Sequence, residues 1–211
     1  MELFSYFRSS AAWRVRIALA LKGLDFDYRA VHLLRSGQSS EAYTRMQPSQ
    51  LVPSLVVDGD AVISQSLAII EYLDETHPTP PLLPPDAVGR AQVRALALDL
   101  ACDTHPLGNL RVLRYLVHEM GVSEDQKNRW IRHWTETGLA VVEQRLQASA
   151  GQFCHGDTVG LADCVLVPQV FNAQRFACRT DHYPTLMRIA AHAMTLPAFA
   201  NTQPSQCPDA E

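Results

Sequence analysis

The stretch Phe7-Arg8-Ser9-Ser10-Ala11-Ala12-Trp13-Arg14-Val15-Arg16-Ile17-Ala18-Leu19 decides the fold. A short apolar strand leads into it, two hydroxyl side chains occupy the turn, and a helix rich in Ala and Leu follows. The first turn of a helix carries backbone N–H groups without intrahelical partners and the positive end of the helix dipole. Ser9 and Ser10 therefore have two interpretations. They are an ordinary N-cap, or they donate hydrogen bonds to an anion such as a thiolate.

The segments around this stretch predict a small α/β domain over residues 1–80. The expected order is β-α-β-α-β-β-α, which builds a mixed sheet with flanking helices and a final antiparallel hairpin, the thioredoxin-like pattern. Asp58-Gly59-Asp60 is typical of the hairpin turn. The expected strands are Leu3–Tyr6, Phe26–Leu33, one at the end of the stretch Leu51–Val57, and Ala61–Ile63. The expected helices are Ala11–Lys22, Glu41–Met46 and Leu67–Glu75.

An all-helical domain over residues 87–211 is expected after a proline-rich linker, residues 81–86, because helices and sheets do not run through closely spaced prolines. A long helix from Ala87 is kinked or ended by His105-Pro106. Residues from Gln203 onward are predicted to form a loose tail. The other expected helices are Leu107–Met120, the segment from the capping box at Ser123 to Ala148, the segment from Gly160 through Phe171, and Pro184–Thr195.

Composition argues against several classes of protein. The net charge is -4, which predicts no nucleic-acid partner. No apolar run approaches the roughly 20 residues that span a bilayer, and no signal peptide is visible, so no membrane is expected. The five cysteines include no C-x-x-C pair, which predicts a reducing cytoplasm without disulfides and no metal site.

Two further pairs of adjacent residues are candidates for binding a ligand. Gln65-Ser66 either caps a helix or, with adjacent N–H groups, holds a carboxylate. Val52-Pro53 is a candidate for a cis peptide bond, since proline is where such bonds occur. A cis bond would turn the Val52 backbone groups toward a bound peptide.

These motifs together resemble a cytosolic glutathione transferase. The opening Ser9-Ser10-x-x-Trp13-Arg14-Val15-Arg16-Ile17-Ala18-Leu19 is similar to that of the zeta class, the maleylacetoacetate isomerases. Further matches are Gln65–Leu73 and Ala162–Val170, and the resemblance covers essentially the whole chain.

The resemblance implies a role for each candidate residue. Ser9 and Ser10 would face the glutathione sulfur, and which of the two contacts it stays open. Arg8 and Arg175 are candidates for binding substrate carboxylates, since guanidinium binds carboxylate in a fork; the alternative is a surface or interdomain ion pair. The implied glutathione-binding set is Ser9, Ser10, Gln38, Val52, Pro53, Gln65, Ser66, His105, Asn109 and Arg111.

One departure bears on mechanism. The family pattern is Ser-Ser-Cys, whereas this chain has Ala11 in the third position, so the nucleophile would be the sulfur of glutathione itself. The implied reaction is cis–trans isomerisation of maleylacetoacetate to fumarylacetoacetate in aromatic amino-acid catabolism. Maleylpyruvate isomerisation in gentisate degradation is the near alternative. A broad transferase or dehalogenase and a non-catalytic binding module are the others. The resemblance also implies a homodimer.

Overall fold

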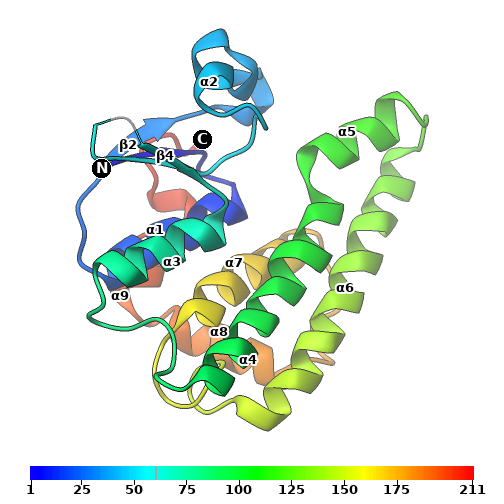
Figure 1. Cartoon of the computed structure of the whole chain (residues 1–211). Helices are drawn as coiled ribbons and strands as arrows, with labels where there is room; N and C mark the ends of the chain where they lie inside the picture. The colour runs from blue at the N-terminus through cyan, green and yellow to red at the C-terminus, as the bar shows by residue number, and fades with distance from the viewer. Residues whose placement is uncertain (60) are drawn as a thin grey trace. The chain divides into compact units, whose positions relative to one another are not determined.

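The chain folds into two compact units, seen in a computed structural model that describes residues 1–59 and 61–211 (Figure 1). One unit comprises Met1–Leu82 together with Thr195–Glu211, and the other comprises Leu83–Met194. The predicted α/β domain and helical domain are both present. The predicted helical domain, 87–211, was wrong at its end, because Thr195–Glu211 belongs to the first unit.

The first unit contains a four-stranded mixed sheet in the order β2-β1-β3-β4. Strand β1 pairs in parallel with β2 and antiparallel with β3, and β3 pairs antiparallel with β4. Leu3 lies opposite both Tyr28 and Leu55. This confirms the predicted sheet and hairpin, although Asp60 of the predicted turn lies outside the described residues. The strands are β1 (Glu2–Ser5), β2 (Asp27–Ala30), β3 (Ser54–Val57) and β4 (Ala61–Ser64).

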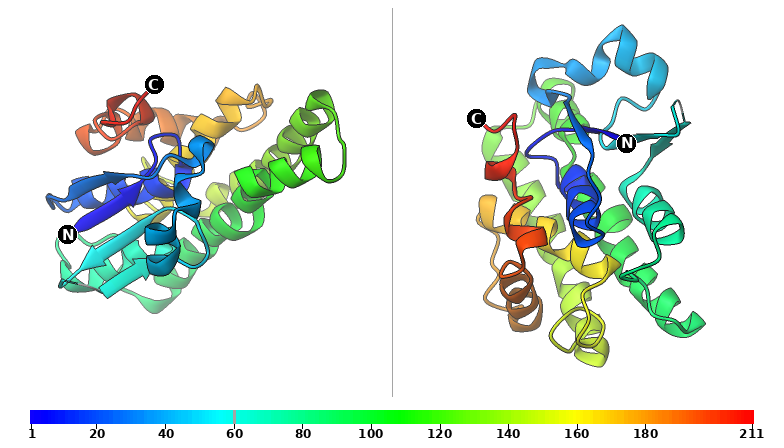
Figure 2. Two further views of the ribbon diagram at one scale, coloured as in Figure 1. Left: turned by 90° about the horizontal axis from the view of Figure 1, so that it is seen from above. Right: turned by 90° about the vertical axis from the view of Figure 1, so that its left-hand side faces the viewer.

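Helices cover both faces of this sheet. Helices α1 (Ser10–Leu21) and α3 (Ser66–Thr76) lie side by side on one face, and α2 (Glu41–Met46) lies on the other (Figures 1 and 2). Successive side chains of a strand point to opposite faces. Accordingly, Phe4 meets the ring of Tyr43 in α2, while Ser5 on the opposite face bonds to Arg16 of α1. Two 3-10 helices, η1 (Leu33–Arg35) and η2 (Gly37–Ser39), precede α2.

The C-terminal segment is attached to this sheet, so the predicted loose tail was wrong. It forms α9 (Pro197–Ala200) and the 3-10 helix η5 (Pro204–Gln206). The Trp13 indole donates to Thr202 Oγ1 at 3.0 Å, and Cys207 is buried in a hydrophobic cluster with Tyr6, Phe7, Val31, Tyr43 and Val52. Packing and hydrogen bonds to residues almost 200 positions earlier hold a segment whose own composition signals a tail.

The second unit is entirely helical. The expected helix from Ala87 to Thr104 ends earlier, because a π-helical turn replaces its last part and Pro106 in η4 has no N–H to donate. The helix expected from Leu107 begins only at Leu110. The elements are α4 (Ala87–Leu98), the π-helix η3 (Asp99–Thr104), the 3-10 helix η4 (His105–Gly108), α5 (Leu110–His118), α6 (Glu124–Ser149), α7 (Leu161–Arg175) and α8 (Pro184–Ala193).

Two buried charged groups stabilise the frame. Lys22, whose side chain is fully buried, donates to Asp74 Oδ1 at 2.6 Å and to the carbonyls of His77 and Pro80, which fixes the start of the linker. In the helical unit the Asp163 carboxylate accepts the N–H groups of Cys154 and Gly160, both at 2.9 Å. Asp163 therefore ties the N-cap residue of α7 to Cys154, while Gly160 itself has no side chain to cap the helix.

Candidate functional site

Ser9 occupies the N-cap of α1, and Ser10 is the first residue of the helix. Ser9 Oγ accepts the N–H of Ala12 at 3.2 Å, so the capping interpretation is right for Ser9. That bond uses a lone pair of the oxygen and leaves the hydroxyl hydrogen available for donation. Ser9 is half-buried, whereas Ser10 is buried. A cap and a donor to an anion are thus compatible at Ser9, and of the two serines it is the more accessible.

Helix α3 begins without a side-chain cap. Gln65 is its N-cap residue, and this residue has a φ of 70° and makes no capping hydrogen bond. A residue other than glycine with positive φ is uncommon, and its backbone is strained. Such strained residues are found more often at functional sites. The next residue, Ser66, is buried, and its Oγ accepts from Arg14 Nη1 at 3.2 Å. The start of α3 therefore offers N–H groups, the positive end of the helix dipole and an oriented hydroxyl, which together suit a carboxylate.

Arg14 was not among the residues that the sequence predicted for the site. It projects from the second turn of α1, is 2% exposed, and joins the helix that begins with Ser10 to the first residue of α3. Because Arg14 donates to Ser66 Oγ, the Ser66 hydroxyl hydrogen must point elsewhere, which makes that hydroxyl a donor. The helix that Ser9 caps is thus hydrogen-bonded, through Arg14, to the predicted residue Ser66. The available signal was an arginine at a buried position of an otherwise apolar helix.

Arg16 was also absent from the residues that the sequence predicted for the site. It is also 2% exposed, and its guanidinium donates to Ser5 Oγ at 3.0 Å, to the Phe7 carbonyl at 3.1 Å and to the Thr202 carbonyl at 3.1 Å. Burial lowers the pKa of Arg16 from its ordinary value. All three acceptors are neutral oxygens. They lie in β1, in the loop before Ser9 and in the C-terminal segment, so Arg16 ties these three segments together.

The Val52-Pro53 peptide bond, a candidate from the sequence for a cis bond, is cis. Val52 is buried in the cluster that also contains Phe7, so the structure brings this predicted residue next to the loop before Ser9. Within residues 1–59 and 61–211, the Val52 N–H and carbonyl have no hydrogen bond, which leaves both for a ligand.

Gln38 lies on η2, and its Oε1 is buried without a hydrogen bond among the described residues. A buried acceptor without a donor costs free energy comparable to a lost hydrogen bond. The neighbouring Ser39 Oγ donates to Gln50 Oε1 at 3.0 Å, which ties η2 to the segment that leads to Val52. Gln38 is therefore placed to receive an N–H from a ligand.

The remaining predicted residues fall in different elements. Arg8 lies in the loop before Ser9, where its Nη2 donates to Tyr6 Oη at 3.3 Å. In the helical unit, His105 begins η4, Asn109 is the N-cap of α5 and Arg111 is exposed on its first turn. Arg175 is exposed at the last residue of α7, stacked at 5.0 Å over Phe176.

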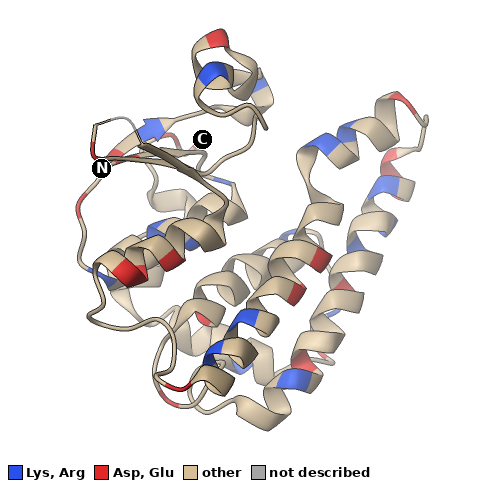
Figure 3. Ribbon diagram, viewed as in Figure 1, with Lys and Arg blue, Asp and Glu red and all other residues tan. Residues whose placement is uncertain are grey.

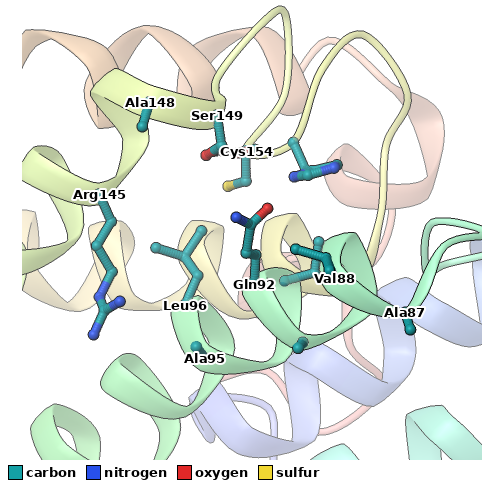
Figure 4. Close-up of a pocket in the computed structure, with 12 residues that line it drawn as sticks. Ala87, Val88, Gln92, Ala95, Leu96, Arg145, Ala148, Ser149 and Cys154 are labelled. Carbon is teal, nitrogen blue, oxygen red and sulfur yellow. Dashed lines mark hydrogen bonds between the residues drawn. The ribbon is translucent and has the colours of Figure 1, made fainter.

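A cavity in the helical unit is separate from all of these residues. It measures about 620 Å³ and lies between α4 and the end of α6 (Figure 4). Gln92, Ser149 and Cys154 point into it, and Arg145 lies at its margin. None of the predicted site residues lines it.

Figure 3 shows charges of both signs spread over the helices, although α3 carries only Asp and Glu and α5 carries only Arg among these charges. Within the described part of the chain, no helix is long and apolar enough to cross a membrane. Nor do three or more His, Cys, Asp or Glu side chains in those residues gather as metal ligands would.

Comparison with known proteins identifies relatives over the full length. A family model described as the glutathione S-transferase N-terminal domain matches residues 3–81. A probable maleylacetoacetate isomerase of Vibrio cholerae serotype O1 is 51% identical over 210 residues, covering 99% of this chain and 97% of the relative.

Two solved structures are similar throughout. A maleyl pyruvate isomerase, described as a bacterial glutathione S-transferase in the zeta class, is 43% identical with a TM-score of 0.97, and all of each chain is covered. A maleylacetoacetate isomerase from Anaeromyxobacter dehalogenans with glutathione in its active site is 45% identical with a TM-score of 0.90, covering 100% of this chain and 97% of the other.

Proposed function

The chain belongs to the glutathione S-transferase family, and from this membership and the two helix starts we propose that it is a glutathione-dependent isomerase of the zeta class. Its proposed reaction converts maleylacetoacetate to fumarylacetoacetate. The observation that carries the proposal is the start of α3, which has no side-chain cap and whose Ser66 hydroxyl is oriented by Arg14 from the helix that Ser9 caps.

The residues present fit glutathione. The uncapped start of α3, with Gln65 and Ser66, suits the carboxylate of the γ-glutamyl end. The Val52 N–H and carbonyl, beside Pro53, suit the backbone of the cysteinyl residue, and the buried Gln38 Oε1 suits an amide N–H near the glycyl end. From the helical unit, His105, Asn109 and Arg111 are proposed to complete the glutathione-binding set.

Bound glutathione supplies a thiolate that adds to the cis double bond, allows rotation about the resulting single bond, and leaves again unchanged. The protein's own part is electrostatic. Ser9 donates its hydroxyl hydrogen toward the sulfur while the dipole of α1 favours a negative charge there, and both effects favour thiolate over thiol. Ser10 is buried and is the first residue of α1, so its proposed role is to fix the start of the helix next to Ser9. Ala11 carries no thiol, so no protein nucleophile competes at this turn.

Arg8 and Arg175 are proposed to bind the two carboxylates of the substrate. Guanidinium keeps its charge and binds a carboxylate through two parallel hydrogen bonds. Their positive charge would also favour the electron density that moves onto the substrate's carbonyl oxygen during addition. Arg175→Ala should then raise the KM for dicarboxylates far more than the KM for a neutral electrophile. Equal effects on both substrates would remove Arg175 from this role.

Maleylpyruvate is the alternative substrate, and the similarity to a maleyl pyruvate isomerase at a TM-score of 0.97 favours keeping it. The deciding assay follows the loss of each diketo or keto acid with a catalytic amount of glutathione. Faster turnover of maleylacetoacetate supports the first assignment, and faster turnover of maleylpyruvate supports the second. Loss of glutathione in step with conjugate would indicate a broad transferase or dehalogenase. Binding to glutathione without turnover of any substrate would indicate a non-catalytic module.

A homodimer in the cytoplasm is also proposed. The apolar side chains of Val88, Leu98 and Val141 on α4 and α6 are 67%, 43% and 44% exposed, which is the kind of apolar exposure that a second copy would cover. Cysteines without C-x-x-C spacing suit a reducing compartment. Light scattering on the purified protein tests the dimer, and a monomeric mass at micromolar concentration would contradict it.

A further inference from the structure

The loop that presents Arg8 and Ser9 is a tight turn. The Ser9 N–H donates to the Tyr6 carbonyl at 2.9 Å, which makes Phe7 and Arg8 the two central residues of a β-turn. The Phe7 ring is buried in the cluster with Val52 and Cys207. The orientation of the Phe7 peptide groups therefore sets where the next two side chains point.

Both backbone groups of Phe7 are held by charged side chains from distant parts of the chain. Its carbonyl accepts from Arg16 Nη2 at 3.1 Å, and its N–H donates to Asp209 Oδ2 at 3.2 Å. The cation comes from α1 and the anion from the C-terminal segment. Hydrogen bonds to charged partners are roughly twice as strong as neutral ones. The turn is thus fixed by a charged hydrogen-bond partner at both the carbonyl and the N–H of Phe7.

Asp209 is itself held in place. Its other oxygen, Oδ1, accepts the Tyr28 hydroxyl at 2.6 Å, and burial together with this bond raises the pKa of Tyr28, so the donor stays protonated. Cys207, two residues earlier, is buried, and the Thr202 carbonyl accepts from Arg16. Arg16 therefore holds both the turn and the segment that carries Asp209.

We propose that Asp209 is a positioning residue for thiolate formation, acting through the Phe7 backbone on the Ser9 hydroxyl. This inference rests on the proposed function, because it assumes that Ser9 donates to the glutathione sulfur. Displacements of about 1 Å at a reacting centre cost up to roughly a hundredfold in rate. A carboxylate that fixes the turn from outside the glutathione-binding set thus controls how well Ser9 favours the thiolate.

The sign of the effect separates positioning from charge. If Asp209 acted only as a nearby negative charge, its removal would favour the thiolate and lower the thiol pKa of bound glutathione. If it positions Ser9, its removal raises that pKa. Asn at this position keeps one acceptor oxygen for Phe7, whereas Ala keeps none.

The experiment titrates the thiolate absorbance of glutathione bound to the full-length protein. The variants are Asp209→Asn and Asp209→Ala, with Tyr28→Phe, which keeps the Asp209 carboxylate but removes the bond that holds its other oxygen, and Asp181→Asn, an exposed carboxylate in the helical unit, as the control. We expect the thiol pKa to rise by about one unit in Asp209→Ala and by less in Asp209→Asn, in line with the loss of one well-placed hydrogen bond. We expect kcat in Asp209→Ala to fall about tenfold or more, with a smaller change in the KM for glutathione.

The proposal is overturned if the thiol pKa of bound glutathione in Asp209→Ala stays at the wild-type value or falls, whether or not the variant loses thermal stability. A wild-type protein that binds glutathione without lowering its thiol pKa would overturn the assigned role of Ser9 as well. A lowered wild-type pKa that is unchanged in both Asp209 variants would overturn this proposal alone.

Discussion

Replacing Arg14 with Met should raise the KM for glutathione about tenfold and leave kcat nearly unchanged. Arg14 Nη1 lies 3.2 Å from Ser66 Oγ, and both residues are buried. The proposed partner of Ser66 is a carboxylate far from the sulfur, so the contact is present in both the ground state and the transition state. An interaction of that kind lowers KM without raising kcat.

The magnitude follows from the geometry. The bond at stake in glutathione binding is the one from the Ser66 hydroxyl to the ligand carboxylate. A hydrogen bond to a charged group contributes about 1.5–3 kcal/mol, and the low end applies because a Ser66 hydroxyl released from Arg14 still reaches the carboxylate in some orientations. The low end, about 1.5 kcal/mol, corresponds to a factor of about ten in affinity. Removal of Arg14 leaves the Ser66 hydroxyl free to turn, so this energy is lost from glutathione binding.

A double-mutant cycle tests the coupling. The assay measures KM and kcat for Arg14→Met, Ser66→Ala and the double variant, with Arg188→Met on the exposed side of α8 as the control. If Arg14 acts through Ser66, the double variant should be no worse than Ser66→Ala alone, since neighbours in one network are not additive. Additive losses, or a fall in kcat at unchanged KM, would refute the reasoning.

Three further outcomes concern stability and pH. Asp163→Asn should lower the free energy of unfolding in urea by about 2–4 kcal/mol, because the amide turns an N–H toward one of two buried backbone donors; a loss below 0.5 kcal/mol would contradict this. Gly138→Ala would place a Cβ 2.0 Å from Thr104 Oγ1, so it should destabilise by about 1–3 kcal/mol despite the better helix former, and Thr104→Ala should restore only part of the loss in the same urea titration, because the Cβ that remains would lie 2.8 Å away. Tyr28 has a raised pKa in the folded chain, so the folded state holds a proton that the unfolded state releases near pH 10. The free energy of unfolding should therefore fall as pH rises above about 10, and Tyr28→Phe should remove that part of the fall.

Local patterns predicted most of the α/β unit. The short apolar run Leu3–Tyr6, the serines before the helix and the candidate cis bond at Val52-Pro53 each depend on a few neighbouring residues, and the structure has a strand at Glu2–Ser5, a Ser9 cap and a cis bond at these places. The same is true of the capping box at Ser123, where Gln126 returns a bond to the Ser123 N–H. These features depend on backbone sterics and short-range hydrogen bonds, which sequence spacing encodes directly.

Features that depend on distant partners were not predictable in this way. The bond between Phe7 and Asp209 spans 202 positions, and nothing in the local sequence of the C-terminal segment signals it. The π-helical turn before His105 lies where Thr104 packs onto Gly138 of α6, a contact between separate helices. The loose tail and the unbroken helix up to Thr104 were therefore the wrong predictions, because tertiary packing outweighed the local signal.

The buried arginines of α1 show why the sequence predicted the serines of the site but not the residues that bond to them or to the neighbouring backbone. Arginine is rarely buried, and a buried charge is weak evidence for stability, since apolar replacements of similar volume are often neutral or stabilising. Arg14 and Arg16 are each 2% exposed and bond to groups that flank the proposed glutathione site. If they are present to orient donors rather than to stabilise the fold, Arg14→Met should keep or raise the melting temperature while glutathione affinity falls. A variant that loses stability and affinity in proportion would show instead that Arg14 serves the fold, and that the arrangement at Ser66 is its by-product.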